Sequence, residues 1–341
     1  MPEALTLAAP AATCRVAMLA VDGALGSSLT APLDAFRVAN TLYRRIHPGA
    51  PEPFLLDLVH AGSARSIQVS GGLTIGGLRP LAADTRILLI PGLSYENPGE
   101  LVDHLEFLGL ERNLLARLAT AGVVIAGSCS GTFLMAASGI LDGRRATTSW
   151  WLAPSFTKRF PAVQLDAAAL YVESEHIITA GAVTAMFTVV LRLIEQRMGP
   201  ELAQNTARIL LVDYERQSQA PYITEALLQR PRSAFSERVE AYLRSHLAHN
   251  LSIDDLAAHC RMSPRTLLRH FQQVYHRTPQ AYLQELRIGR AKALLETTAL
   301  NLPEVVEQCG YSDVASFRKL FKRLTDLTPA DYRERFRLRG P

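Results

Sequence analysis

The sequence predicts two successive domains: an α/β domain with a parallel sheet and helices on both faces, then an all-α domain with two helix-turn-helix units. Three observations predict this. Short apolar runs alternate with helical segments in the first two thirds of the chain, one helical unit occurs twice near the C-terminus, and positive charge is concentrated around that repeat. The 341 residues are enough for two domains of ordinary size.

Four apolar runs in the first part of the chain are typical of strands buried on both faces; they cover residues 15–21, 54–60, 85–90 and 122–126. Helices are expected at residues 33–45, 100–120, 184–198 and 201–213. This alternation favours a flavodoxin-like parallel sheet covered by helices on both sides. The last two of these helices are largely apolar, and we expect them to close the domain or to build a dimer face.

A polar segment with two prolines, residues 215–233, is predicted to link the two domains. The expected boundaries are therefore 13–214 for the α/β domain and 234–338 for the helical domain. Within the helical domain, the pattern predicts a first helix to about residue 248, a long connecting helix over residues 279–297 and a short final helix from Pro329.

The helical domain contains the same unit twice. Residues 253–263 correspond to residues 302–312, an offset of 49, whereas Thr278-Pro corresponds to Thr328-Pro, an offset of 50. The second copy therefore has one extra residue in its turn. A short helix, a tight turn and a second helix with a polar outer face form the unit that places a recognition helix in the major groove of DNA.

Helical periodicity divides the second helix of each unit into a core face and an outer face. The core face is predicted to contain Leu267, Leu268, Phe271 and Val274 in the first copy, and Val314, Phe317, Leu320, Phe321 and Leu324 in the second. The candidate DNA-binding residues are Ser263, Arg265, Thr266, Arg269, Ser312, Asp313, Ser316, Arg318, Lys319, Lys322 and Arg323. Residues near each helix N-terminus are the candidates for base edges, and the later cations for bases or phosphates. A merely solvated amphipathic face is the alternative, which the matched recurrence disfavours.

Charge and cysteine usage limit the class of protein. Residues 231–341 contain 18 Lys and Arg against 12 Asp and Glu, whereas residues 1–230 contain 18 against 20. This asymmetry is typical of one domain that meets phosphate and one that does not. No run of 18 apolar residues occurs and the four cysteines lack CxxC spacing, so we expect a cytoplasmic protein with no membrane partner, metal site or cofactor.

Residues 234–337 resemble the AraC/XylS family of transcriptional regulators. The resemblance rests on Ser312-Asp-x-x-x-Phe317-x-x-x-Phe321-Lys-Arg, on the Gly310-Tyr311 turn and on Leu327-Thr-Pro-x-x-Tyr332-Arg. It implies sequence-specific control of transcription, usually activation, by two unequal helix-turn-helix units that bind double-stranded promoter DNA, with RNA polymerase as an expected partner. Cys260 and Cys309 are expected to be small buried hydrophobic residues where each first helix packs into its turn.

Cys129 lies in the segment of the α/β domain that suggests chemistry. A buried strand is predicted to end at Gly127 and a helix to begin just past Ser130-Gly131, so Cys129 would occupy the sharp strand-to-helix turn that exposes a nucleophile at the carboxyl edge of such a sheet. The helix N-terminus behind it is expected to favour a thiolate and to bind anions.

The stretch from about residue 15 to 213 resembles the ThiJ/PfpI family of the class I glutamine amidotransferase-like superfamily, and most of all the GlxA-like regulators that join this domain to an AraC-type domain. Pro32-Leu-Asp34, Pro91-Gly92, the Cys129 turn and Leu141-Asp-Gly-Arg-Arg-Ala-Thr-Thr-x-Trp150 carry the resemblance. Enzymes of the family pair the cysteine with a histidine and often use an acidic residue after the first strand.

Two departures from that enzymatic pattern predict a domain without catalysis. Ser149 stands before Trp150, where a histidine is common, and residues 22–28 supply no Glu before Pro32. A thiol without a positioned base lacks a proton carrier for turnover, so Cys129 is expected to be a vestigial nucleophile. His176 or His60 could still approach it in three dimensions.

The predicted ligand-binding residues form a cleft at this turn: Cys129, Ser130, Gly92, Leu93, Ser149 and Trp150. The resemblance suggests a small nitrogen-containing effector, such as an amino acid or a quaternary amine, and a homodimer. Three alternatives remain. Cys129 could merely fill a tight turn in a dimerisation scaffold, the chain could be a cysteine-dependent enzyme with an autoregulatory DNA-binding domain, or it could be an architectural dimer that responds to no ligand.

Overall fold

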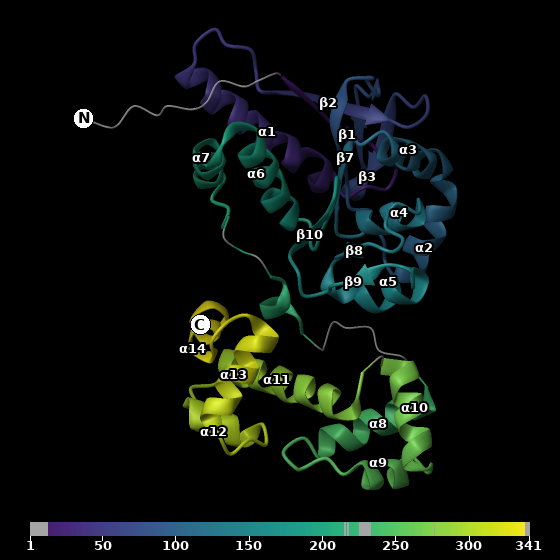
Figure 1. Cartoon of the computed structure of the whole chain (residues 1–341), viewed down its shortest axis with the longest axis vertical. Helices are drawn as coiled ribbons and strands as arrows, with labels where there is room; N and C mark the ends of the chain where they lie inside the picture. Colours follow the sequence, from purple (N-terminus) through teal and green to yellow (C-terminus); the bar gives the residue numbers. More distant parts are fainter. Residues whose placement is uncertain (1–12, 215, 217, 225–232, 276, 338–341) are drawn as a thin grey trace, which may run out of the picture. The chain divides into compact units, whose positions relative to one another are not determined.

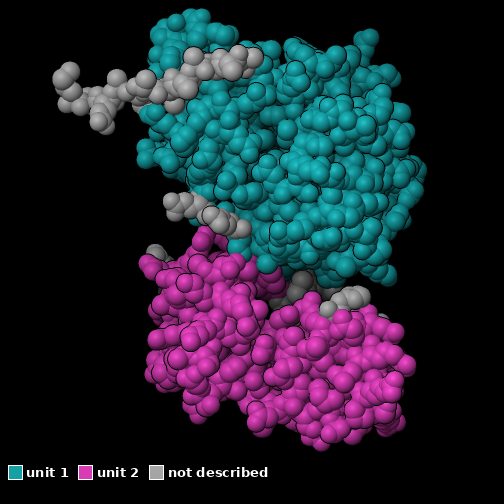
Figure 2. Space-filling model, viewed as in Figure 1, with its two compact units in different colours: residues 1–219 teal, residues 220–341 magenta. Residues whose placement is uncertain are grey.

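A computed structural model describes residues 13–214, 216, 218–224, 233–275 and 277–337. The chain divides into two compact units, residues 1–219 and 220–341, which are shown in different colours in Figure 2. We refer to them as the N-terminal unit and the C-terminal unit. The predicted linker, residues 215–233, lies partly outside the described residues.

The N-terminal unit is built on a seven-stranded sheet with the strand order β10-β11-β7-β6-β1-β2-β5. Its strands are β1 (Cys14–Leu19), β2 (Phe54–His60), β5 (Arg79–Pro80), β6 (Thr85–Ile90), β7 (Val124–Ser128), β10 (Tyr171–Ser174) and β11 (Ile177–Ala180). All neighbours are parallel except β10 and β11. Two small sheets pair β3 (Ser66–Val69) with β4 (Leu73–Gly76) and β8 (Arg145–Ala146) with β9 (Gln164–Leu165). The prediction of a mostly parallel sheet is confirmed.

Helices cover both faces of this sheet (Figure 1). One face carries α1 (Gly26–Ile46), α6 (Ala185–Met198) and α7 (Pro200–Leu210), and the other carries α2 (Pro98–Phe107), α3 (Gly109–Thr120), α4 (Gly131–Ala137) and α5 (Ala153–Arg159). In β1, Val16 and Met18 belong to the first core, and Ala17 and Leu19 to the second. Because successive side chains point to opposite faces of a sheet, an apolar run without alternation is what a strand buried on both sides requires.

The predicted helix 100–120 is wrong as a single helix. Two helices, α2 and α3, meet at Leu108, whose φ of −93° and ψ of 43° interrupt the helical path. Gly109, a poor helix former, begins the second helix. Gly122, predicted to start a strand, instead has φ +73°, a left-handed conformation that ends the turn after α3, and the strand begins at Val124.

The C-terminal unit is all helical, as predicted. It contains α8 (Ala234–Ser245), α9 (Ile253–His259), α10 (Pro264–Tyr275), α11 (Pro279–Thr297), α12 (Leu302–Gln308), α13 (Val314–Thr325) and α14 (Pro329–Phe336), preceded by the three-residue 3-10 helix η3 (Ala220–Tyr222). Helices α9 and α10 form the first helix-turn-helix, and α12 and α13 form the second. Their separate cores are joined by α11, because Leu283 and Leu286 belong to the first core and Ala291 and Leu295 to the second.

The one-residue difference between the two turns is confirmed. Residues 260–263 connect α9 to α10, whereas residues 309–313 connect α12 to α13. In both turns a left-handed residue ends the first helix: Arg261 with φ +57° and Gly310 with φ +78°. Within the described residues, no helix is long and apolar enough to cross a membrane.

The predicted core face of the recognition helices holds with one exception. Phe317, Leu320 and Phe321 are buried in α13, but Leu268 in α10 is 44% exposed. Leu268 lies at the edge of the apolar arc, and its counterpart in the second copy is the exposed Arg318. The position therefore belongs to the outer face in both copies, and placing Leu268 in the core was wrong.

Candidate nucleic-acid interface and ligand cavity

The outer faces of α10 and α13 are open to solvent. Of the predicted DNA-binding residues, Thr266 is half-buried and the others are exposed. Neither helix contains an Asp or Glu, whereas α13 alone carries Arg318, Lys319, Lys322 and Arg323. Such a face supplies the positive potential that phosphate binding needs.

Two of the predicted residues act as helix caps. The Asp313 carboxylate accepts hydrogen bonds from the backbone amides of Ala315 (3.1 Å) and Ser316 (2.9 Å), and hydrogen bonds from Ser316 are the main cause of its lowered pKa. Ser263 Oγ likewise accepts from the amide of Thr266 (3.3 Å) and lies 2.9 Å from the Thr266 hydroxyl. Sequence reasoning assigned both residues to bases, although Ser and Asp directly before a helix are also the usual capping residues.

A buried cation connects the two helix-turn-helix units. Arg287 of α11 is 6% exposed and donates to the carbonyls of Leu247 and His249, both at 2.7 Å, in the loop before α9. Its guanidinium also lies 5.0 Å from the ring centre of Tyr311, in the turn of the second unit. Arg287 therefore joins the loop before the first helix-turn-helix to the turn of the second helix-turn-helix. The two recognition helices thus have a defined relative placement within the C-terminal unit.

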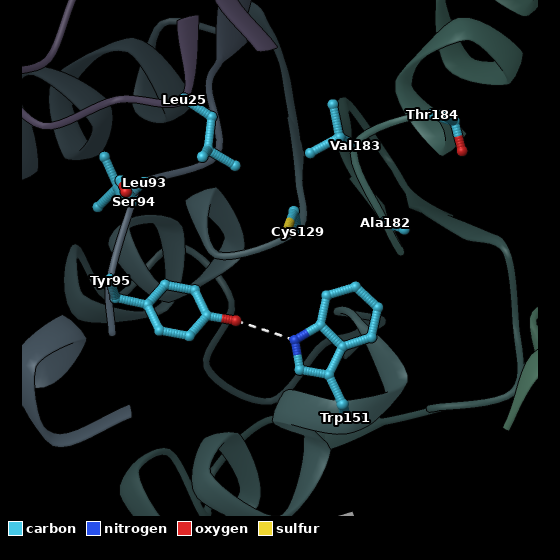
Figure 3. Close-up of a pocket in the computed structure, with 9 residues that line it drawn as sticks. All are labelled: Leu25, Leu93, Ser94, Tyr95, Cys129, Trp151, Ala182, Val183 and Thr184. Atoms are coloured by element: carbon cyan, nitrogen blue, oxygen red, sulfur yellow. Dashed lines mark hydrogen bonds between the residues drawn. The ribbon is translucent and has the colours of Figure 1, made fainter. Parts of the chain in front are cut away.

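The N-terminal unit contains a cavity of about 360 Å³ at the carboxyl edge of the sheet (Figure 3). Its lining comes from segments that follow β1, β6, β7 and β11, together with Trp151, and consists of Leu25, Leu93, Ser94, Tyr95, Cys129, Trp151, Ala182, Val183 and Thr184. This is the edge at which open α/β sheets bind ligands.

The strand-to-helix turn predicted at Cys129 is confirmed. Cys129 has φ +56°, its amide donates to Gly181 O at 2.5 Å, and its carbonyl accepts from the hydroxyls of Thr132 (2.7 Å) and Thr148 (3.0 Å). The amides of Thr132 and Phe133 donate to the carbonyls of Cys129 and Ser130 within the turn. The second and third amides of the seven-residue helix α4 are therefore used within the turn, which leaves fewer amides for an anion.

Only part of the predicted ligand-binding set lines the cavity. Cys129 and Leu93 do, whereas Ser130 is fully buried and bonds the backbone of Leu93. The remaining predicted residues, Gly92, Ser149 and Trp150, lie outside the lining. The aromatic wall is instead formed by Trp151, whose Nε1 donates to the Tyr95 hydroxyl at 2.9 Å.

Tyr95 was missed by sequence reasoning. The available indication was its position just after the carboxyl end of β6, since residues at that point converge on the ligand edge. Burial raises the pKa of Tyr95, opposed by the hydrogen bond from Trp151. The phenol is therefore a neutral group at physiological pH.

The described residues that line the cavity include no histidine and no carboxylate. His176, which the sequence left open as a partner for Cys129, places Nε2 2.8 Å from Ala119 O at the end of α3. His60, the other candidate, is also absent from the lining. Neither candidate histidine therefore accompanies the Cys129 thiol in the described lining of the cavity.

Comparison with known proteins agrees with an α/β unit followed by a helix-turn-helix unit. The family described as "Helix-turn-helix domain" matches residues 256–335. The chain is 29% identical to the HTH-type transcriptional regulator ArgR of Pseudomonas aeruginosa over 65% of its own length and 68% of that protein's. It is 25% identical to GbdR of the same species over 68% of this chain and 61% of that one, and 29% identical to GlxA of Rhizobium meliloti over 65% and 68%. The chain thus spans about two thirds of the length of these relatives.

A solved structure shows the fold of the N-terminal unit. The crystal structure of a putative transcriptional regulator protein from Vibrio parahaemolyticus matches 58% of this chain and all of that one, with 21% identity and a TM-score of 0.50. Together with the helix-turn-helix match, these relatives show that the chain is similar to GlxA-like transcriptional regulators of the AraC family, with an α/β domain followed by a helix-turn-helix domain.

Proposed function

We propose that this regulator recognises a DNA sequence with α10 and α13 and senses a small nitrogen-containing metabolite in the cavity beside Cys129, without catalysis. Two observations together support the proposal. The recognition helices α10 and α13 contain no Asp or Glu, and the described lining of the cavity is mostly apolar and contains no histidine or carboxylate. Each feature suits binding, and the described lining supplies no histidine or carboxylate to carry a proton in turnover.

The residues of the two recognition helices are assigned different kinds of contact according to their position along each helix. Arg265, Thr266 and Ser316 lie in the first turns of α10 and α13, where recognition helices approach base edges. Arg269 and the four cations of α13 lie further along and supply phosphate contacts or further base contacts. Ser263 and Asp313 hold the helix starts, and Ser312 lies exposed beside the second start.

The lining of the cavity favours an amine whose charge is spread over alkyl groups. Trp151 and Tyr95 present aromatic surface, which attracts weakly hydrated cations. A compact ammonium group would need hydrogen-bond acceptors such as a carboxylate, and the described lining contains no carboxylate. Quaternary amines therefore fit the cavity better than free amino acids, although both belong in the test. A homodimer and contact with RNA polymerase are proposed on the family resemblance, with the ligand biasing DNA binding to the extent that it prefers one state.

The proposal is tested by thermal unfolding of the full chain against a panel of amino acids, amines and betaines. A ligand at a hundredfold excess over its Kd should stabilise the protein by about 2.7 kcal/mol. Trp151→Ala should abolish the ligand-induced rise in melting temperature, whereas Trp150→Phe, which changes a residue outside the lining, should keep it. A hit must also change operator affinity. A blank panel would favour the scaffold alternative, and ligand turnover would favour the enzyme.

A further inference from the structure

A short segment around residue 220 is anchored at both of its ends. We refer to the described residues 216 and 218–223 as the strap. Gln219 and Ala220, neighbours in sequence, are 2% and 4% exposed, and the boundary between the two compact units falls between them. Each end of the strap is held by its own set of hydrogen bonds.

The first anchor is the Gln219 side chain, which lies within the N-terminal unit. Its Nε2 donates to Thr148 O (2.8 Å) and Ala169 O (3.0 Å), and its backbone amide donates to Ala168 O (2.8 Å). Gly181 packs so closely on this side chain that an added Cβ would lie 2.3 Å from the Gln219 Cδ. A side chain at 181 would therefore displace the Gln219 carboxamide from its present position.

The surface on which Gln219 is anchored is a wall of the cavity. Gly181 O accepts the Cys129 amide at 2.5 Å, and the next three residues, Ala182, Val183 and Thr184, line the cavity. Arg216 donates to the Thr184 hydroxyl at 3.3 Å. The strap is thus attached twice to the loop 181–184, so displacement of that loop would displace the strap.

The second anchor is Lys292 of α11, within the C-terminal unit. Lys292 is 6% exposed, and its Nζ donates to the carbonyls of Ala220 (2.9 Å), Pro221 (3.3 Å) and Ile223 (2.9 Å). Burial lowers the pKa of Lys292 to about 8, opposed by the charge of Glu296. A buried ammonium that has lost its carbonyl partners is strongly unfavourable, so this anchor resists release.

Residues 220–222 of the strap pack against the second helix-turn-helix and the helix that follows it. Helix η3 packs beside the recognition helix α13. The Tyr222 ring lies 5.2 Å from the ring of Phe336 in α14, and its hydroxyl accepts a hydrogen bond from Arg335 at 2.8 Å. The strap is therefore part of the packing that positions α13.

We infer that the strap couples the cavity loop 181–184 to the recognition helix α13, so that occupancy of the cavity and the state of the second helix-turn-helix influence each other. The inference rests on the proposed roles of the cavity and of α13. Its physical basis is that the two anchored residues are consecutive in the chain: Gln219 is held in the N-terminal unit and Ala220 is held by Lys292 in the C-terminal unit, so no spacer residue separates them. Such a coupling is reciprocal: a change at either anchor alters the other.

The test is hydrogen–deuterium exchange of the full chain without ligand or DNA. Lys292→Met removes the second anchor and should raise amide exchange in peptides covering residues 181–184 at least about threefold, through more frequent local opening. Arg287→Met is the matched control, since Arg287 is an equally buried cation of α11 whose hydrogen bonds go to carbonyls of the loop before α9, whereas those of Lys292 go to the strap. It should leave residues 181–184 unchanged.

The reverse experiment covers the case in which Lys292→Met does not fold. Gln219→Ala removes the first anchor and should raise exchange in α13 and α14 by a similar factor. Changes confined to the mutated unit, or an equal effect of Arg287→Met on residues 181–184, would overturn the coupling. Because no effector is used, a blank metabolite panel leaves this result intact, and a failed coupling leaves the sensor proposal standing.

Discussion

Gly310 lies directly against the backbone of Ala248: a Cβ at Gly310 would be 2.6 Å from Ala248 Cα and 2.7 Å from its carbonyl oxygen. Gly310 ends α12 of the second helix-turn-helix, and Ala248 precedes α9 of the first. This contact stands beside Arg287, which bonds the carbonyls on either side of Ala248. Two helix-turn-helix units that share a contact this close cannot shift relative to each other without breaking it.

Gly310→Ala is therefore expected to destabilise the junction of the two units. A left-handed conformation costs an L-residue about 1–2 kcal/mol, and the clash with Ala248 adds to this cost. Urea unfolding combined with exchange in α12 and α13 measures the loss. Gly139→Ala is the control, because Gly139 has a similar φ of +80° and no atom within 4 Å of the added Cβ. Equal losses for both variants would show that the junction does not depend on the close contact.

Lys322→Ala should weaken binding to all DNA sequences about equally and reduce the slope of log K against log salt by ~1, because an exposed lysine late in α13 is placed to contact phosphate. Titrations of specific and random duplexes at several salt concentrations measure this slope. Lys158→Ala, an exposed lysine in the N-terminal unit, should leave it unchanged. An unaltered slope for Lys322→Ala would remove the phosphate role.

Arg265→Ala should reduce affinity for the preferred site by about 1–3 kcal/mol and affect random DNA much less, since Arg265 lies exposed in the first turn of α10. Selection from a randomised duplex pool identifies the site, and the variant should show relaxed preference at a few positions. Equal weakening on every sequence would instead assign Arg265 to the DNA backbone.

Cys309 should make stability fall at alkaline pH. Burial raises the pKa of Cys309 from 9.0 to about 11, although Arg290 and Arg287 oppose the rise. A folded pKa above the unfolded value means that the contribution is complete below pH 9 and is lost as pH rises through 11; two pKa units correspond to about 2.7 kcal/mol. The stability difference between wild type and Cys309→Ala should therefore narrow between pH 9 and 11. A constant difference would contradict this.

Cys129→Ser should retain both the ligand-induced rise in melting temperature and its effect on DNA affinity, because no base in the described lining activates the thiol. Thermal unfolding and operator titration with the hit from the metabolite panel measure the two effects. Trp151→Ala serves as the variant expected to lose both. If a folded Cys129→Ser protein no longer responds, covalent chemistry at the thiol belongs to the sensing step.

The sequence predicted what depends on local periodicity and turn chemistry. The strands β2 and β6, the helix α11 and the turn at Cys129 appear where apolar runs, proline and small residues indicated them. The exceptions are also local: Gly109 divides the helix 100–120, and Leu268 lies at the edge of an apolar arc, where 100° of rotation leaves its burial undecided. The tandem helix-turn-helix followed from an internal repeat, which needs no tertiary information to recognise.

The sequence by itself therefore determined the fold class, the order of the two kinds of domain and the faces of the recognition helices. Only the tertiary structure decided which distant residues meet: Tyr95 with Trp151, Gly181 with Gln219 and Gly310 with Ala248. Periodicity fixes which side of an element is apolar, because each residue's direction repeats along the chain. It does not fix which elements pack together, since that depends on close packing among segments that are far apart in sequence.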